Sequence, residues 1–152
     1  MWPLSRSCPD RREGISDLAL DPAIRAFLEE RRFAVLGTIN TGGTPQQSVM
    51  WYMLDGDTIV MNTRRGRVKD RNLLNDNRAS FCVEDGQRYV AISGQIQMND
   101  DQTIAQADIK ALATRYDGPE EAEQVSANTF SKQQRVTLRM SIDRVGAYGF
   151  DE

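Results

Sequence analysis

Apolar residues alternate with polar ones over much of the chain, and this pattern predicts β-strands. Between Tyr89 and Met98, every second residue from Val90 onward is apolar or glycine, and the residues between them are small or polar. A period of two is typical of a strand with one buried face. Alternating or β-branched apolar runs predict further strands over residues 33–40, 44–54, 58–62, 79–84 and 135–142, with a seventh over 145–150.

Short glycine-containing turns separate these strands. The dipeptides at 55–56 and 85–86 are both Asp-Gly, which is a strong hairpin signal between two strand patterns. Residues 41–43, Thr-Gly-Gly, form a similar turn. Strands joined in this way pair antiparallel. Because many strands in a small chain leave exposed edges, the sheet is expected to close or nearly close into a barrel.

Helical patterns are fewer. Asp21 followed by Pro22 predicts an N-cap and the first position of a short helix. Asp100 and Asp101 begin a second helix that extends to about Tyr116. Its expected apolar face consists of Ile104, Ala107, Ile109, Ala111 and Leu112. A shorter helical pattern follows residue 66, and residues 118–133 show no regular pattern. The fold class is therefore α+β and mainly β, with six or seven strands and two or three flanking helices.

The length of 152 residues fits one domain, which is expected over residues 21–152. Residues 1–20 are rich in Pro, Arg, Ser and Asp and are interpreted as an N-terminal arm. They contain no apolar segment typical of a signal peptide, and no apolar run in the chain approaches membrane-spanning length. A cytoplasmic protein without membrane contact is expected.

Composition removes several kinds of chemistry. The chain has no histidine, which excludes a Ser-His-Asp triad, a histidine general base and a histidine-ligated zinc. Cys8 and Cys82 do not have the spacing of metal ligands, so no metal site is predicted. The formal net charge is -3, which argues against a nucleic-acid-binding surface.

A local basic cluster contrasts with this acidic background. Arg64, Arg65, Arg67, Lys69 and Arg71 surround one glycine, between a strand and the short helical pattern. A helix N-terminus already favours an anion, so these cations predict a phosphate site. Alternation along the chain leaves at most one of the first two arginines facing it. The alternative is a solvated, charged helix face.

The order of these elements resembles a known family. The resemblance covers residues 27–148 and depends on segments 34–38, 43–46, 49–52, 63–73, 76–80, 89–94 and 112–116. Among them, 63–73 reads Thr-Arg-Arg-Gly-Arg-Val-Lys-Asp-Arg-Asn-Leu. The chain resembles the flavin-binding split-barrel family typified by pyridoxamine 5'-phosphate oxidase. Within that family it is most similar to small oxidoreductases that use the deazaflavin coenzyme F420. The resemblance implies a split β-barrel.

The resemblance also implies a cofactor site. One strand would run along the ring of the cofactor, with residues Gln47, Ser48, Val49, Met50 and Trp51. The end of another strand and the basic turn would hold the phosphate, with residues Asn62, Thr63, Arg67 and Lys69. Arg71 and Asn72 would contact the phosphate or a more distant anionic tail. Trp51 and Tyr52 are expected on opposite faces, one in the core and Trp51 near the ring.

The function implied is F420-dependent transfer of a hydride to a small unsaturated or quinone-like substrate, with no assigned catalytic side chain. One alternative is an FMN-dependent oxidase or reductase on the same barrel. Another is a non-catalytic module that carries a cofactor or binds nucleic acid through the basic turn. The C-terminus lacks the tryptophan that oxidase members use, which argues against pyridoxamine phosphate oxidation. Family members are usually homodimers with the cofactor between subunits, and residues 118–133 and the arm are candidates for the interface or a substrate lid.

Overall fold

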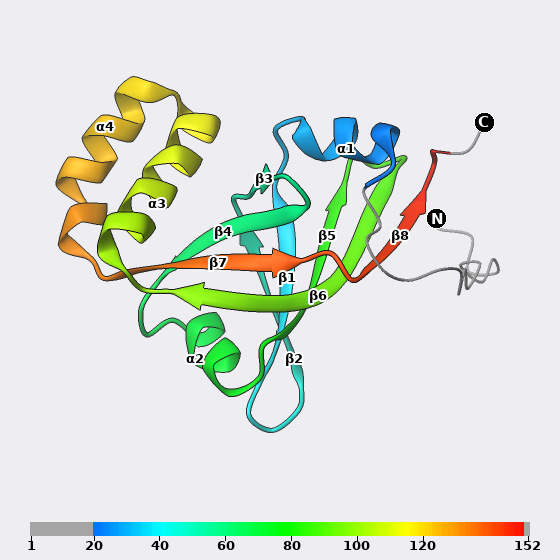
Figure 1. Cartoon of the computed structure of the whole chain (residues 1–152), viewed down its shortest axis with the longest axis horizontal. Helices are drawn as coiled ribbons and strands as arrows, with labels where there is room; N and C mark the ends of the chain where they lie inside the picture. Colours follow the sequence, from blue (N-terminus) through cyan, green and yellow to red (C-terminus); the bar gives the residue numbers. More distant parts are fainter. Residues whose placement is uncertain (1–19, 151–152) are drawn as a thin grey trace.

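The computed structural model describes residues 20–150, which form one curled antiparallel sheet with helices around it (Figure 1). The strands are β1 Ala34–Ile39, β2 Pro45–Met50, β3 Met53–Asp55, β4 Thr58–Arg64, β5 Arg78–Glu84, β6 Tyr89–Asn99, β7 Arg135–Ser141 and β8 Arg144–Tyr148. The helices are α1 Pro22–Glu29, α2 Val68–Asn75, α3 Gln102–Asp117, α4 Pro119–Asn128 and the 3-10 turn η1 Phe130–Lys132. The mainly β, α+β class is confirmed. Within the described residues there are eight strands and four α-helices, more of each than predicted.

The strand order makes the sheet a half-barrel. It runs β2-β1-β5-β6-β7-β4-β3, with β8 on β6. β6 bridges two parts of the sheet, because its first half pairs with β5 and β8, whereas Ile96–Asn99 pairs with β7. Gly94 lies at the change, where an added Cβ would be 1.9 Å from the carbonyl oxygen of Ser141. No side chain fits there, so the sequence permits this crossing only with glycine.

The concave side of the sheet holds the core. Its largest fully buried side chains include Tyr52, Phe27, Phe81, Leu28, Leu36, Ile59 and Met61. Helix α1 contributes two of them and begins as predicted, with Asp21 accepting a 2.9 Å hydrogen bond from the Ala23 N–H. Leu20, the last residue of the predicted arm, is also buried, and residues 1–19 of the arm lie outside the described residues. None of the helices in the described part of the chain has the length and hydropathy needed to cross a membrane.

The strand predicted over residues 44–54 is interrupted. β2 ends at Met50 and β3 begins at Met53, because a contact from α3 holds the two residues between them. The Tyr52 N–H donates to the Tyr116 hydroxyl at 3.1 Å, and the Trp51 ring stacks on the Tyr116 ring with centroids 5.2 Å apart. Tyr52 is in the core and Trp51 is half-buried, so one residue of the pair is a core residue, as expected.

Two expectations about the helices were wrong. Residues 118–133 are largely helical, since Gly118, with φ at +90°, ends α3 and Pro119 begins α4 at once. The buried face of α3 is Ala105, Ile109, Leu112, Ala113 and Tyr116. Ile104 is 44% exposed, and Ala107 and Ala111 are exposed as well, because the face turned toward the sheet runs through Ala105, Ile109 and Leu112. Figure 1 shows α3 and α4 side by side at one end of the sheet, and α2 near the β1–β2 hairpin.

Candidate functional site

The basic turn connects β4 to α2 through a glycine in the left-handed region, Gly66 with φ at +93°. The Gly66 N–H donates to Asp70 Oδ2 at 2.7 Å, so the buried Asp70 carboxylate holds the turn from inside. Arg65 forms ion pairs with Asp70 at 2.7 Å and with Asp100 at 2.9 Å. Arg64 does not take part in these contacts and lines a pocket on the other side of the strand. The expectation that the two arginines diverge is met by this geometry.

A pocket of about 420 Å³, which we call the basic pocket, lies at this turn. It is lined by Gln46, Ser48, Arg64, Gly66, Arg67, Val68, Lys69 and Arg71. Within residues 20–150 none of its four cations forms an ion pair, although most of the arginines around the barrel do. Arg67 is the N-cap of α2 and makes no side-chain capping bond. The positive end of this helix and four unpaired cations therefore face one pocket.

Lys69 is the most buried of these cations, with only 9% of its surface exposed. Burial lowers the pKa of Lys69, and the nearby charges of Arg67 and Arg135 lower it further. Among the described residues its ammonium has neither a carboxylate nor a hydrogen-bond acceptor within bonding distance. A buried charge without a partner is costly, so this position is suited to an anion that comes from outside the chain.

Arg135 adds a second buried charge behind the pocket. It lies directly opposite Arg64 in the β4–β7 register, an arrangement of like charges that destabilises a sheet. Its guanidinium donates to Asn62 Oδ1 at 2.9 Å and to Gln133 Oε1 at 2.8 Å, and both acceptors are neutral. Burial, Arg67 and Arg64 together lower the pKa of Arg135 to about 10. The site thus has a positive potential that the described residues do not neutralise.

Strand β2 forms the other wall of the basic pocket. Gln46 and Ser48 point into it, and the Ser48 hydroxyl is buried without any hydrogen-bond partner among the described residues. Among the described strands β2 pairs only with β1, so its outer edge offers backbone N–H and C=O groups that these strands leave unpaired. An orphaned hydroxyl and a free strand edge beside unpaired cations fit a ligand with both an anionic and a flat polar part.

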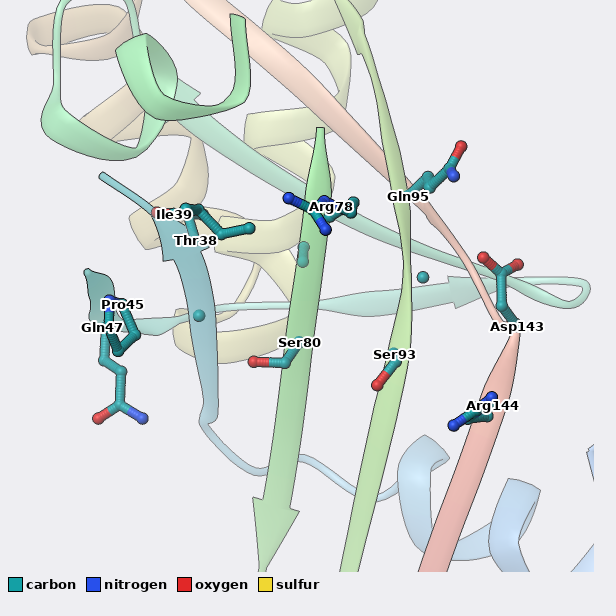
Figure 2. A pocket seen from close by; sticks show the side chains of 13 residues that line it. Thr38, Ile39, Pro45, Gln47, Arg78, Ser80, Ser93, Gln95, Asp143 and Arg144 are labelled. Carbon is teal, nitrogen blue, oxygen red and sulfur yellow. The ribbon is translucent and has the colours of Figure 1, made fainter. Parts of the chain in front are cut away.

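A second pocket of about 440 Å³, the sheet-face pocket, lies on the convex side of the sheet (Figure 2). Gly37 and Gly94 line it and carry no side chains that would fill it; at Gly37 a Cβ would be 2.4 Å from Ser80 Oγ. Figure 2 shows Ser80 and Ser93 on adjacent strands in the middle, between Gln47 on one side and Arg144 on the other. Because β2 alternates, Gln47 lies here and not in the basic pocket.

The predicted residues thus separate into groups. Ser48, Arg67, Lys69 and Arg71 line the basic pocket, and Gln47 lines the sheet-face pocket. Val49 is 68% exposed on the convex face, Met50 is in the core, and Trp51 is stacked on Tyr116. Thr63 is buried in β4. These four residues, and Asn62 and Asn72, lie on neighbouring elements, and the cofactor contacts of all eleven predicted residues stay predictions.

Asn62 and Asn72 are engaged within the protein. Asn62 accepts from Arg135 and donates to the Ala105 carbonyl at 3.0 Å. The Asn72 amide donates to Thr38 Oγ1 at 3.1 Å and to Asn40 Oδ1 at 2.9 Å. Neither residue lines either pocket. Both asparagines therefore support the surrounding structure through hydrogen bonds and do not form the pocket surface.

Two residues of the basic pocket region were not predicted. Gln46 shares a face of β2 with Ser48, and the period of two in this strand could have indicated it. Arg135 is 64 or more residues distant along the chain from the basic turn and approaches it only through the β4–β7 pairing. Its local sequence is an ordinary strand pattern, which carries no signal of this role.

The family follows from a match over most of the chain. A family model described as pyridoxamine 5'-phosphate oxidase matches residues 20–148. The chain belongs to this family. A comparison with the curated proteins found no match to the sequence.

Solved structures of the pyridoxamine 5'-phosphate oxidase fold agree with the assignment. A conserved hypothetical protein of Mycobacterium tuberculosis is 27% identical, with a TM-score of 0.73, over 90% of this chain and 89% of the other. A protein described as an F420 reductase is 24% identical, with a TM-score of 0.66, over 80% and 94%. The heme storage protein HutZ of Vibrio cholerae is 18% identical, with a TM-score of 0.63, over 86% and 94%. The last two show similarity of fold alone.

Proposed function

We propose that this protein is an F420-dependent oxidoreductase that transfers a hydride between the reduced deazaflavin and a small unsaturated or quinone-like substrate. The observation that carries the proposal is the basic pocket, with the buried and unpaired Lys69 on α2 facing the free edge of β2. A phosphate-bearing ring cofactor needs an anion site and a hydrogen-bonding edge next to each other. The F420 reductase among the similar structures supports the choice of cofactor.

The residues of the basic pocket fit the phosphate of such a cofactor. Lys69 and Arg67 would form charge-assisted hydrogen bonds with its oxygens, together with the N–H groups at the start of α2. Ser48 would donate its unpartnered hydroxyl. Arg71 and Arg64 lie at the same pocket and would interact with further negative charge on the ligand. The unpaired backbone groups of β2 would bind the polar edge of the ring.

The proposed reaction requires the side chains to bind and orient the cofactor but not to act as nucleophiles. F420 supplies a transferable hydride when bound. The chain contributes binding and orientation, and its lack of histidine is compatible with that role. The β2 edge would orient the ring, and Trp51, which is stacked on Tyr116, would limit movement at the end of the strand. Substrate would approach the face of the ring that the protein leaves open.

FMN on the same barrel is the second candidate, since it also joins a phosphate to a flat ring and would use the same two walls. A heme carrier is less well supported. The name of HutZ describes heme storage, but the present sequence contains no histidine, the residue that ligates heme iron in many heme proteins. A third candidate is a non-catalytic F420 carrier, which would bind F420 without accelerating its oxidation by any acceptor.

We also propose a homodimer with the cofactor between subunits. The convex face of the sheet carries exposed Val35 and Val49, two residues along their strands from Gly37 and Gln47, which line the sheet-face pocket. Exposed apolar side chains gathered on one face are typical of an interaction site. A second copy of the chain would cover them and complete the ring site. Sedimentation equilibrium measures the assembly, and a monomer at micromolar concentration with F420 bound would contradict the proposal.

Titration with both cofactors tests the function. We expect F420 to bind more tightly than FMN, with reduced F420 oxidised faster when a quinone or an activated alkene is added with the protein than without it. FMN binding without F420 binding would favour the second candidate. Tight F420 binding with no acceleration for any acceptor would identify a carrier.

A further inference from the structure

The two walls of the basic pocket belong to elements that share no strand pairing. The cations are at the end of β4, on the turn that follows and on α2. Ser48 is on β2, which within residues 20–150 pairs only with β1. The affinity for a ligand that binds both walls depends on the distance between α2 and β2. The backbone of the sheet does not set this distance directly.

A chain of side-chain hydrogen bonds joins the two walls. The Asn72 amide on α2 donates to Thr38 Oγ1 at 3.1 Å, and the Thr38 hydroxyl donates to Gln46 Oε1 at 2.8 Å. Gln46 then donates from Nε2 to the Gln47 carbonyl oxygen at 3.0 Å, within β2 itself. A second branch runs from Asn72 to Asn40 at 2.9 Å and from Asn40 to Thr44 at 3.1 Å, in the β1–β2 hairpin.

The direction of this chain is fixed by its members. The Asn72 amide gives one hydrogen to each branch, so its nitrogen is fully used. The Thr38 hydroxyl accepts one bond and donates one, which forces Gln46 to present its carbonyl to Thr38 and its amide to Gln47. Asn72 and Thr38 are both buried, where an unmade hydrogen bond is costly. One pattern of donors and acceptors along this chain of hydrogen bonds is therefore strongly preferred.

We propose that the Asn72–Thr38–Gln46 relay is a spacer that sets the distance between the phosphate subsite on α2 and the ring subsite on the β2 edge. Thr38 and Asn72 are thus positioning residues that act through the two walls, although neither lines the basic pocket. The relay fixes the distance between the two walls before the ligand binds, so the cofactor does not have to order them. The inference rests on the proposed function, because it presupposes a ligand with both parts.

The test compares a whole cofactor with its anionic part alone. Thr38→Val keeps the side-chain shape and removes both hydroxyl bonds of the relay. We expect this variant to weaken F420, or FMN if that is the cofactor bound, about tenfold, the factor for roughly one lost hydrogen bond. Its affinity for inorganic phosphate, measured by calorimetry in the full-length chain, should stay within about twofold of the wild-type value, because the cations remain in place. Thr38→Ser, which retains the hydroxyl, should restore cofactor binding.

Two controls separate positioning from general damage. Thr114→Val removes a comparable hydroxyl bond, to the Lys110 carbonyl on α3, and should leave both affinities unchanged. Lys69→Ala should weaken the cofactor and phosphate together. Asn72→Leu interrupts the relay at its other end and replaces Thr38→Val if that variant unfolds at the assay temperature.

The outcomes are distinct. Cofactor affinity unchanged in Thr38→Val, or lowered by the same factor as phosphate affinity, would overturn the spacer role and leave the proposed function intact. A wild-type protein that binds phosphate but neither cofactor would overturn both. Selective loss of cofactor affinity with rescue by Thr38→Ser supports the spacer.

Discussion

Helices α2 and α3 begin in opposite ways, although only two or three residues separate each from the strand before it. At α3, Asp101 accepts hydrogen bonds from the N–H groups of Thr103 at 2.9 Å and Ile104 at 3.4 Å. At α2 the corresponding position is Arg67, which makes no capping bond. The carboxylate in its first turn, Asp70, is used by Arg65 and by the Gly66 N–H.

This difference distinguishes α3, which is capped within the chain, from α2, for which we propose a binding role. The N-terminus of a helix needs a negative group, and α3 carries its own in Asp101. At α2 the chain supplies cations where a cap is usual, and buries Lys69 among them without a counterion. Under the proposed function, the free energy lost there is recovered when the phosphate of the cofactor binds. The comparison predicts that variants at the two helices affect stability and binding separately.

Arg67→Asp gives α2 the same kind of cap as α3, and it should have the largest effect. We expect cofactor affinity to fall by about 3 kcal/mol, since a cation is lost and a negative charge now repels the phosphate. The ligand-free protein should become more stable by about 0.5–1 kcal/mol through the new cap. Fluorescence titration and chemical denaturation measure the two quantities. Lower stability together with lower affinity would mean that Arg67 supports the fold.

Lys69→Met removes the buried charge and keeps most of the side-chain volume. Cofactor affinity should fall by about 1–3 kcal/mol, the range for one charge-assisted hydrogen bond. The ligand-free protein should unfold at a higher temperature, because the desolvated ammonium and its repulsion by Arg67 and Arg135 are gone. Calorimetry in phosphate-free buffer checks this. An unchanged affinity would show that the phosphate subsite lies elsewhere.

Asp101→Ala removes the cap of α3. The protein should lose about 1 kcal/mol of stability, as is usual for an N-cap. Cofactor affinity should stay the same, since α3 does not contribute to the basic pocket. Urea denaturation followed by cofactor titration at low urea measures both. A loss of affinity as large as that in Lys69→Met would remove the distinction between the helices.

The pH dependence of binding should show the smallest effect. Lys69 is charged below its pKa, which lies under the usual 10.5, so affinity falls as the pH rises through this lowered value. The unfolded chain keeps its proton over that interval, so the contribution of Lys69 to the stability of the ligand-free protein rises with pH in the same window. We expect an affinity loss of about threefold to tenfold between neutral and alkaline pH, below 1.4 kcal/mol. Lys69→Arg, which stays charged, should flatten the curve.

The sequence indicated features whose cause is local. The cap at Asp21, the glycine turn at residue 66 and the alternation of β6 all depend on neighbours along the chain, and each was predicted. The positive charge of the basic turn was also visible, because five cations lie within eight residues.

Features that depend on tertiary contacts were missed. The break between β2 and β3 is made by Tyr116, which lies 64 residues from Tyr52 and bonds to its N–H. Helix α4 has only one buried residue, Ala122, so its sequence lacks an apolar stripe. The relay from Asn72 to Thr38 joins residues 34 positions apart, and nothing in either segment indicates that their side chains meet.

The free edge of β2 has a further consequence for the behaviour of the protein in solution. Unpaired backbone groups on an edge strand are a template on which a strand of another chain can add, which leads to aggregation. β2 has only six residues, begins with Pro45, which has no N–H to donate, and continues with two glutamines and a serine. This short and polar sequence resists the addition of a foreign strand. Under the proposed function, the chain would keep this edge open for the cofactor and still disfavour uncontrolled self-association.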